Sequence, residues 1–180
     1  MAQRRISAEL LLQPVKDCLR ALATDIAEGF SCDRAQLLNS GALAIKAGGS
    51  AIVKIGAAIY ATAVGAAGNV VVVTKAINTD MAALAGTVTA DMFNVYCFFV
   101  DSAGTLTTSM GTEGATLGAV VFPTFPSTKA CIGFLIVNPT GTGDFVGGTT
   151  PLDDVTVVPN AVYVNTVGAF RPTIAQTIIP

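Results

Sequence analysis

The sequence contains no histidine and no tryptophan, and charged side chains make up only 12% of its 180 residues. Without histidine, Ser-His-Asp and Cys-His nucleophilic sites are excluded, and a zinc site would have to be built from other ligands. The charges are also unevenly placed. From Ala35 to Pro180 there are only five basic and seven acidic side chains. This long segment therefore has few surface charges to prevent its association with other chains.

The charge deficit predicts that the protein associates with itself or with a larger assembly, so that much of its neutral surface is buried. The alternative is a neutral monomer whose surface is covered by Ser, Thr and Asn. The net charge of −2 provides no basic patch for nucleic acid, and Arg4-Arg5 is only a pair of charges. No nucleic-acid partner is expected.

The four cysteines, Cys18, Cys32, Cys97 and Cys131, contain no C-x-x-C pair, and no histidine is available to complete a metal site. Each lies in an apolar run, which indicates buried free thiols that pack as small hydrophobic groups. Disulfides remain an alternative. We expect no metal ion and no cofactor.

Other catalytic patterns also fail. Ser50 and Lys54 are one residue too far apart for an S-x-x-K motif. Asp153 and Asp154 are adjacent, so on a strand they would point to opposite faces; we interpret them as turn-capping acids. The glycine-rich segment 140–148 lacks the G-K-[ST] sequence and the following helix of a phosphate-binding loop, and is expected to be a surface loop. We predict no catalytic residues and a protein that is not an enzyme.

The segment from Ile55 to Thr74 carries no charge over twenty residues, the length that a membrane span requires, but Gly65, Gly68 and Asn69 interrupt it with a turn signal. β-Branched residues flank that turn. Two strands joined as a hairpin explain the pattern better than a membrane span. Residues 1–30 alternate charged and apolar positions, so no secretory leader is expected.

One amphipathic helix is predicted, from Pro14 to Glu28, and residues 1–40 are expected to form an N-terminal helical arm. An apolar stripe recurs at three- and four-residue spacing, and Pro14 and Gly29 suit the two ends of a helix. The residues of the stripe are Val15, Cys18, Leu19, Leu22 and Ile26. Such a stripe must be buried in the domain itself, in another subunit or in a host protein.

Residues 41–180 are predicted to form a mainly β domain, an antiparallel β-sandwich or barrel of jelly-roll-like type. Short β-branched and aromatic runs alternate there with Gly, Pro, Asn and Asp. Residues 81–91 are either a short helix or a loop. The expected strands lie near 42–47, 51–64 (broken at Gly56), 69–75, 93–101, 104–110, 117–122, 130–138, 154–158 and 161–166.

The strand from Phe93 to Asp101 is predicted to be central, because both of its faces are apolar except at Asn94. We assign Phe99 to the sandwich core. Phe98 is then expected on the opposite face, where a neighbouring subunit or the N-terminal helix would cover it.

Three segments carry a resemblance to small virion structural proteins of tailed bacteriophages. They are MGTEGATLGAVVFPTFP at 110–126, IGFLIVNPTGTGDFVGGTTPLDD at 132–154 and PNAVYVNTVGAF at 159–170. The chain resembles head-decoration (cement) or head-fibre proteins most. None of the three segments contains a catalytic motif.

The resemblance implies a capsid decoration protein that binds the outer surface of the major capsid protein, commonly as a homotrimer, in a virion assembled in the host cytoplasm. The alternative is a tail or vertex fibre module that contacts host surface polysaccharide. A cellular enzyme or ligand-binding barrel is the third hypothesis, which the missing histidine disfavours. No membrane partner is expected.

Overall fold

The computed structural model describes residues 34–138, 142–159, 161–170 and 172. The predicted helix at 14–28 and most of the predicted arm lie outside these residues, as do Cys18 and Cys32. The described chain is mainly antiparallel β structure, with one short 3₁₀ helix, η1 (Leu117–Ala119). The predicted fold class is confirmed. No helix in this part of the chain has the length and apolar character needed to cross a membrane.

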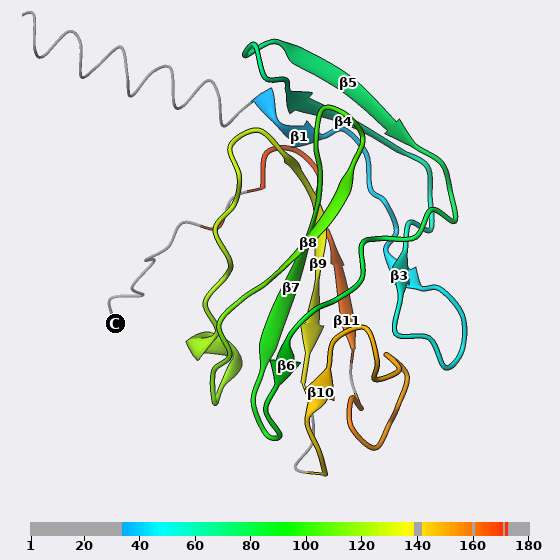
Figure 1. Ribbon diagram of the computed structural model, residues 1–180, viewed down its shortest axis with the longest axis vertical. Helices are drawn as coiled ribbons and strands as arrows, with labels where there is room; N and C mark the ends of the chain where they lie inside the picture. Colours follow the sequence, from blue (N-terminus) through cyan, green and yellow to red (C-terminus); the bar gives the residue numbers. More distant parts are fainter. Residues whose placement is uncertain (1–33, 139–141, 160, 171, 173–180) are drawn as a thin grey trace, which may run out of the picture.

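The larger sheet has four antiparallel strands in the order β11-β9-β7-β8 (Figure 1). Its strands are β7 (Asn94–Val100), β8 (Leu106–Met110), β9 (Ala130–Val137) and β11 (Val162–Asn165). The turn between β7 and β8 lies where the sequence predicts it. The Asp101 carboxylate accepts hydrogen bonds from the backbone N–H groups of Ala103 and Thr105, at 3.0 and 2.8 Å, which closes this hairpin.

The smaller sheet has the order β1-β4-β5, with β1 (Gln36–Leu37), β4 (Ile59–Val64) and β5 (Val70–Lys75). β4 and β5 form the hairpin predicted for the charge-free segment. Its turn is closed by a hydrogen bond from the Gly65 N–H to the Asn69 carbonyl, at 2.8 Å. Because β1 belongs to this sheet, β structure begins before residue 41.

Two further pairs of two-residue strands each form a separate two-stranded sheet. β2 (Ala44–Ile45) pairs with β3 (Val53–Lys54), and β6 (Thr87–Val88) pairs with β10 (Phe145–Val146). The predicted break at Gly56 is confirmed, since its N–H donates to the carbonyls of Gly41 and Ala42 instead of continuing a ladder. Within 81–91 the loop alternative is correct apart from β6.

The two main sheets pack together in a sandwich-like arrangement, in which the smaller sheet crosses one end of the larger sheet (Figure 1). Apolar side chains from both sheets meet between them and are fully buried. From the smaller sheet these are Leu37, Ile59 and Ala61; from the larger sheet they include Tyr96, Phe98, Val100 and Ile132.

β7 is buried along its whole length, and the prediction of a central strand is confirmed. The assignment of its two faces is wrong. Phe98 points into the core between the sheets, whereas Phe99 belongs to a second cluster, on the side of the larger sheet that points away from the smaller sheet. Residues of this same chain cover that second face, so no neighbouring subunit is needed there. The aromatic members of the cluster are Phe99, Phe122, Phe125, Phe134 and Phe170.

Two predicted strands are absent. At 117–122 the chain forms η1, because the N–H groups of Ala119 and Val120 bond locally to the carbonyls of Thr116 and Leu117. Only Val121 makes a single bridge, to Thr112. At 154–158 the chain turns. The Asp154 carbonyl accepts hydrogen bonds from the N–H groups of residues 157 and 158, which leaves no extended segment to pair.

The ladder between β7 and β9 contains one irregularity. Phe98 lies opposite Gly133, but Phe99 lies opposite Cys131, so Ile132 is the extra residue of a β-bulge. Gly133 itself is opposite Asn165 of β11. At this point three strands come close together, and the glycine has no side chain to keep them apart.

Candidate functional site

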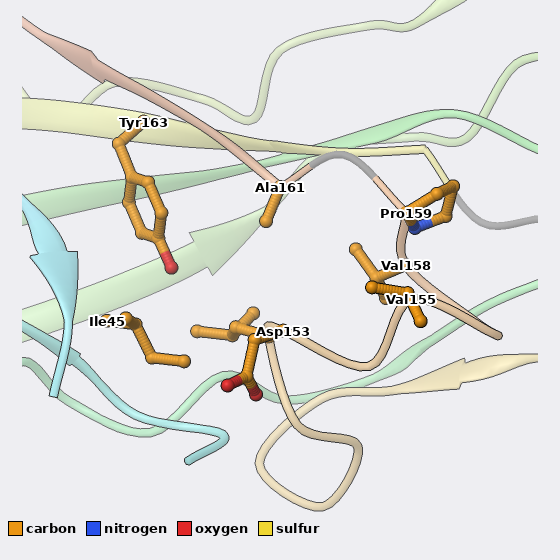
Figure 2. Close-up of a pocket in the computed structure, with 8 residues that line it drawn as sticks. Ile45, Asp153, Val155, Val158, Pro159, Ala161 and Tyr163 are labelled. Atoms are coloured by element: carbon orange, nitrogen blue, oxygen red, sulfur yellow. The ribbon is translucent and has the colours of Figure 1, made fainter. Parts of the chain in front are cut away.

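A cavity of about 340 Å³ opens between β2, β11 and the turns at 152–159 (Figure 2). Most of the side chains that line it are apolar, and two oxygen-bearing side chains, Asp153 and Tyr163, add polar character. The apolar lining consists of Ile45, Leu152, Val155, Val158, Pro159 and Ala161. A cavity of this size and composition is suited to a small ligand or to one unit of a larger ligand.

The two polar groups of the pocket have different roles. Both carboxylate oxygens of Asp153 accept hydrogen bonds from the Gly49 backbone N–H, at 3.1 and 2.9 Å, and thereby hold the 47–50 turn against the pocket. The Tyr163 hydroxyl points into the space between the lining side chains (Figure 2), is itself buried and has no hydrogen-bond partner among the described residues.

Burial, and secondarily the negative charge of Asp153, raises the pKa of Tyr163 to about 12. Its hydroxyl therefore stays protonated at neutral pH. In this state Tyr163 can donate a hydrogen bond to a ligand oxygen but cannot act as a base.

The cysteines of the described chain are Cys97 and Cys131, and both are buried, as predicted for these two. Burial, with a smaller contribution from Cys131, raises the pKa of the Cys97 thiol well above its usual range. A thiol in this state is a poor nucleophile. No group of three potential metal ligands occurs among the residues that the structure describes.

The acidic pair lies in turns, as interpreted from the sequence. Asp153 caps the Gly49 turn, and the Asp154 carboxylate accepts a hydrogen bond from the Thr156 N–H at 2.9 Å. Ser50 and Lys54 are likewise engaged separately: the Ser50 hydroxyl accepts from the Ile52 N–H, and the Lys54 ammonium donates to Asn78.

The glycine-rich segment 140–148 is only partly the surface loop predicted for it; residues 140 and 141 lie outside the described chain. Phe145 is fully buried in the main core and belongs to β10. The Asp144 carboxylate accepts a hydrogen bond from the Ala90 N–H at 2.9 Å. This segment is therefore fixed to the sandwich, because a large aromatic side chain at its centre is buried.

A second candidate site is the outer face of the β1-β4-β5 sheet, which we call the outer face. Leu38, Tyr60, Val70 and Val72 are all about half exposed or more, at 50%, 53%, 46% and 66%. Tyr60 lies opposite Thr74 and Thr62 lies opposite Val72, so these side chains project from the same side of the sheet. A group of exposed apolar side chains of this kind is typical of an interaction surface.

Tyr96 provides a test of the packing between the sheets. Its hydroxyl is buried without a hydrogen-bond partner among the described residues, while its ring makes an edge contact with Phe145 at 6.0 Å. Because an unpaired buried hydroxyl is destabilising, Tyr96→Phe is expected to raise the free energy of unfolding by about 1–2 kcal/mol. Urea denaturation at pH 7 measures this change, and a loss of stability would contradict the described environment.

The same residue predicts a pH dependence. Burial, and secondarily the charge of Glu113, raises the pKa of Tyr96 from 10.0 to about 12. As the pH rises, the unfolded chain therefore loses this proton before the folded chain does. The free energy of unfolding does not depend on this titration below pH 10, and it falls as the pH rises from 10 toward 12. In Tyr96→Phe this part of the alkaline loss is expected to disappear.

A scan against protein-family models and searches of curated proteins and of solved structures found no match to this chain.

Proposed function

We propose that this chain is a non-enzymatic virion structural protein, a capsid decoration protein that binds the outer surface of a major capsid protein and associates with itself. The sequence resemblance at 110–126, 132–154 and 159–170 supports the virion role. The observation that carries the binding role is the outer face, where Leu38, Tyr60, Val70 and Val72 present an uncharged apolar surface. The homotrimer is implied by the resemblance alone.

The outer face is suited to binding because its aromatic residue is central and its framework is rigid. Tyr60 lies on β4, the middle strand of the sheet, and its backbone is bonded on the β1 side through the Leu38 N–H at 2.8 Å. Its N–H is also held by the Asn39 side chain at 2.7 Å. Exposed tyrosines on rigid backbone lose little conformational entropy on binding, and tyrosine is enriched among the residues that dominate interfaces.

Tyr60→Glu is expected to weaken binding to capsid shells by about tenfold or more, because it removes an aromatic anchor and adds a charge to an apolar contact. The measurement is cosedimentation of the full chain with shells that lack it. Leu117→Glu is the matched control, since Leu117 is 50% exposed but lies in η1, outside the β1-β4-β5 sheet. Equal binding by wild type and Tyr60→Glu would contradict the proposed interface.

The virion role has its own test. Quantitative mass spectrometry of purified particles should find this chain in numbers comparable to the major capsid protein. Absence of the chain from particles would overturn the proposal. Removal of residues 1–29, which lie within the predicted arm, should weaken attachment without unfolding the β domain.

A tail or vertex fibre module is the second candidate, and the pocket at Tyr163 is the observation that favours it. An apolar wall with one free hydroxyl and a nearby carboxylate suits a saccharide unit, which offers both apolar faces and hydroxyl groups. A fibre would be present in far fewer copies than the major capsid protein, so the same mass-spectrometric count separates the two candidates.

A further inference from the structure

The smaller sheet has one covered edge and one open edge. On the β1 side, Leu37 forms a bridge with Gly168, with backbone hydrogen bonds of 3.2 and 2.6 Å in the two directions. On the other side, β5 is bonded only to β4 within the described chain. The β8 edge of the larger sheet differs from the β5 edge, because a neighbouring segment lies against it. The Thr108 hydroxyl of β8 donates a hydrogen bond to the Ala82 carbonyl at 2.9 Å.

The hairpin geometry identifies which backbone groups of β5 are free. Directly opposed residues of an antiparallel pair alternate between hydrogen-bonded and non-bonded pairs. Gly65 is bonded to Asn69, so the next pair, Val64 with Val70, is non-bonded, and the alternation continues along the ladder. The N–H and C=O groups of Val70, Val72 and Thr74 therefore point away from β4. The bond from Leu38 to Tyr60 agrees, since Tyr60 lies opposite Thr74 and bonds on the β1 side.

The open edge carries little of the usual protection against pairing. Soluble proteins guard such edges with charges, prolines, bulges or very short strands. β5 is six residues long with the sequence VVVVTK, and its ladder with β4 runs without a register shift. Its one charged residue is Lys75, at the last position. Four successive valines also favour extended backbone strongly.

We propose that β5 pairs antiparallel with β5 of a second copy of this chain, about a twofold axis at Val72, to join two smaller sheets into one sheet of six strands. This inference rests on the self-association in the proposed function and names its surface. In this register Val72 of one copy lies opposite Val72 of the other, and Val70 lies opposite Thr74. All three residues with free backbone groups are then paired.

The charges agree with this register. Each Lys75 lies opposite Asn69 of the other copy, so the two lysines stay at opposite ends of the new ladder and no like charges face each other. The outer face also continues from one copy to the next, because Val70 and Val72 of both copies project from the same side. A trimer, which the sequence resemblance implies, would need a different surface.

The test is the mass of the full chain in solution, measured by sedimentation at micromolar concentration. Wild type is expected at twice the chain mass of 18.3 kDa. Val72→Lys is expected to sediment as a monomer under the same conditions, since it places two positive charges directly opposite each other. Val72→Pro should do the same, because it removes an N–H that points away from β4 and therefore leaves the hairpin intact. Leu117→Lys, in η1 and outside the smaller sheet, is the control and should keep the wild-type mass.

The register has a separate test. Opposed residues of a hydrogen-bonded antiparallel pair have Cα atoms about 5.5 Å apart, a separation that a disulfide can span. Val72→Cys is therefore expected to crosslink two chains under mild oxidation, whereas Val70→Cys, which is not opposite itself, should remain at the wild-type background.

The outcomes separate the two proposals. If the oligomer persists unchanged in Val72→Lys and Val72→Pro, the β5 pairing is wrong but the proposed self-association is still supported. A wild-type chain that sediments as a monomer would overturn both. Incorporation into particles is measured independently, so the virion role survives or fails on its own evidence.

Discussion

Phe98→Ala is expected to lower the free energy of unfolding by about 3–5 kcal/mol. The Phe98 ring is fully buried in the core between the two sheets, with its strand paired on both sides. Truncation removes the buried apolar surface and leaves a cavity that the flanking strands cannot fill, because their ladders fix them in place. Urea denaturation monitored by circular dichroism measures the change.

Phe99→Ala extends this test to the other face of β7. Phe99 is 1% exposed and makes an edge contact with Phe125 at 5.1 Å, within the aromatic cluster of this same chain. A loss of similar size, about 3–5 kcal/mol, is therefore expected. Tyr60→Ala is the exposed control and should change stability by less than about 0.5 kcal/mol. If Phe99→Ala altered oligomer mass and left unfolding unchanged, the cluster would instead belong to an interface.

Gly133→Ala is expected to destabilise the protein by about 1–3 kcal/mol or more through overpacking. An added Cβ would collide with the carbonyl oxygen of Val164 on β11 and lie 2.7 Å from the Leu43 side chain. The Val164 oxygen is backbone, so β11 itself must move away from β9.

Gly118→Ala is the matched control for this substitution. A Cβ at Gly118 meets no atom within 4 Å, so its stability should stay within about 0.5 kcal/mol of wild type. Thermal unfolding of the two variants compares them directly. A silent Gly133→Ala would mean that β9 and β11 are farther apart at the bulge than described.

The long strands were predictable because their signals are local. β4, β5, β7 and β9 each combine β-branched or aromatic runs with a nearby turn signal, such as the Gly65–Asn69 segment. By contrast β1, β6 and β10 have two residues each, and they are strands only because distant segments pair with them. No periodicity can develop over two residues, so these strands were missed.

The faces of β7 could not be assigned from the sequence because every position except Asn94 is apolar. Alternation separates Phe98 from Phe99 but does not tell which of them faces the opposite sheet. The cover over Phe99 comes from segments around Phe122 and Phe170, which no short-range pattern links to β7. The error at 117–122 has a different origin. Local hydrogen bonds in η1 replaced the pairing that its apolar residues favour.

The candidate sites were harder to predict from the sequence than the strands were. The pocket joins Ile45 to residues 152–163, and only the tertiary fold brings them together. The outer face could not be predicted from the sequence. Residues 70–73 are all valine, so the sequence does not show which positions of β5 are exposed. One signal was available: a strand of four valines with a single terminal lysine is unusual for a sheet edge.

The bridge between Leu37 and Gly168 has a consequence for how the chain folds during synthesis. It joins the first described strand to a residue beyond the last one, so the smaller sheet cannot close its β1 edge until Gly168 has left the ribosome. Until then both edges of that sheet are exposed on the nascent chain. Contacts between the ends of a chain also slow folding, because a large loop must close first. The sandwich is thus expected to be completed only after Gly168 has emerged, and assembly to follow that step.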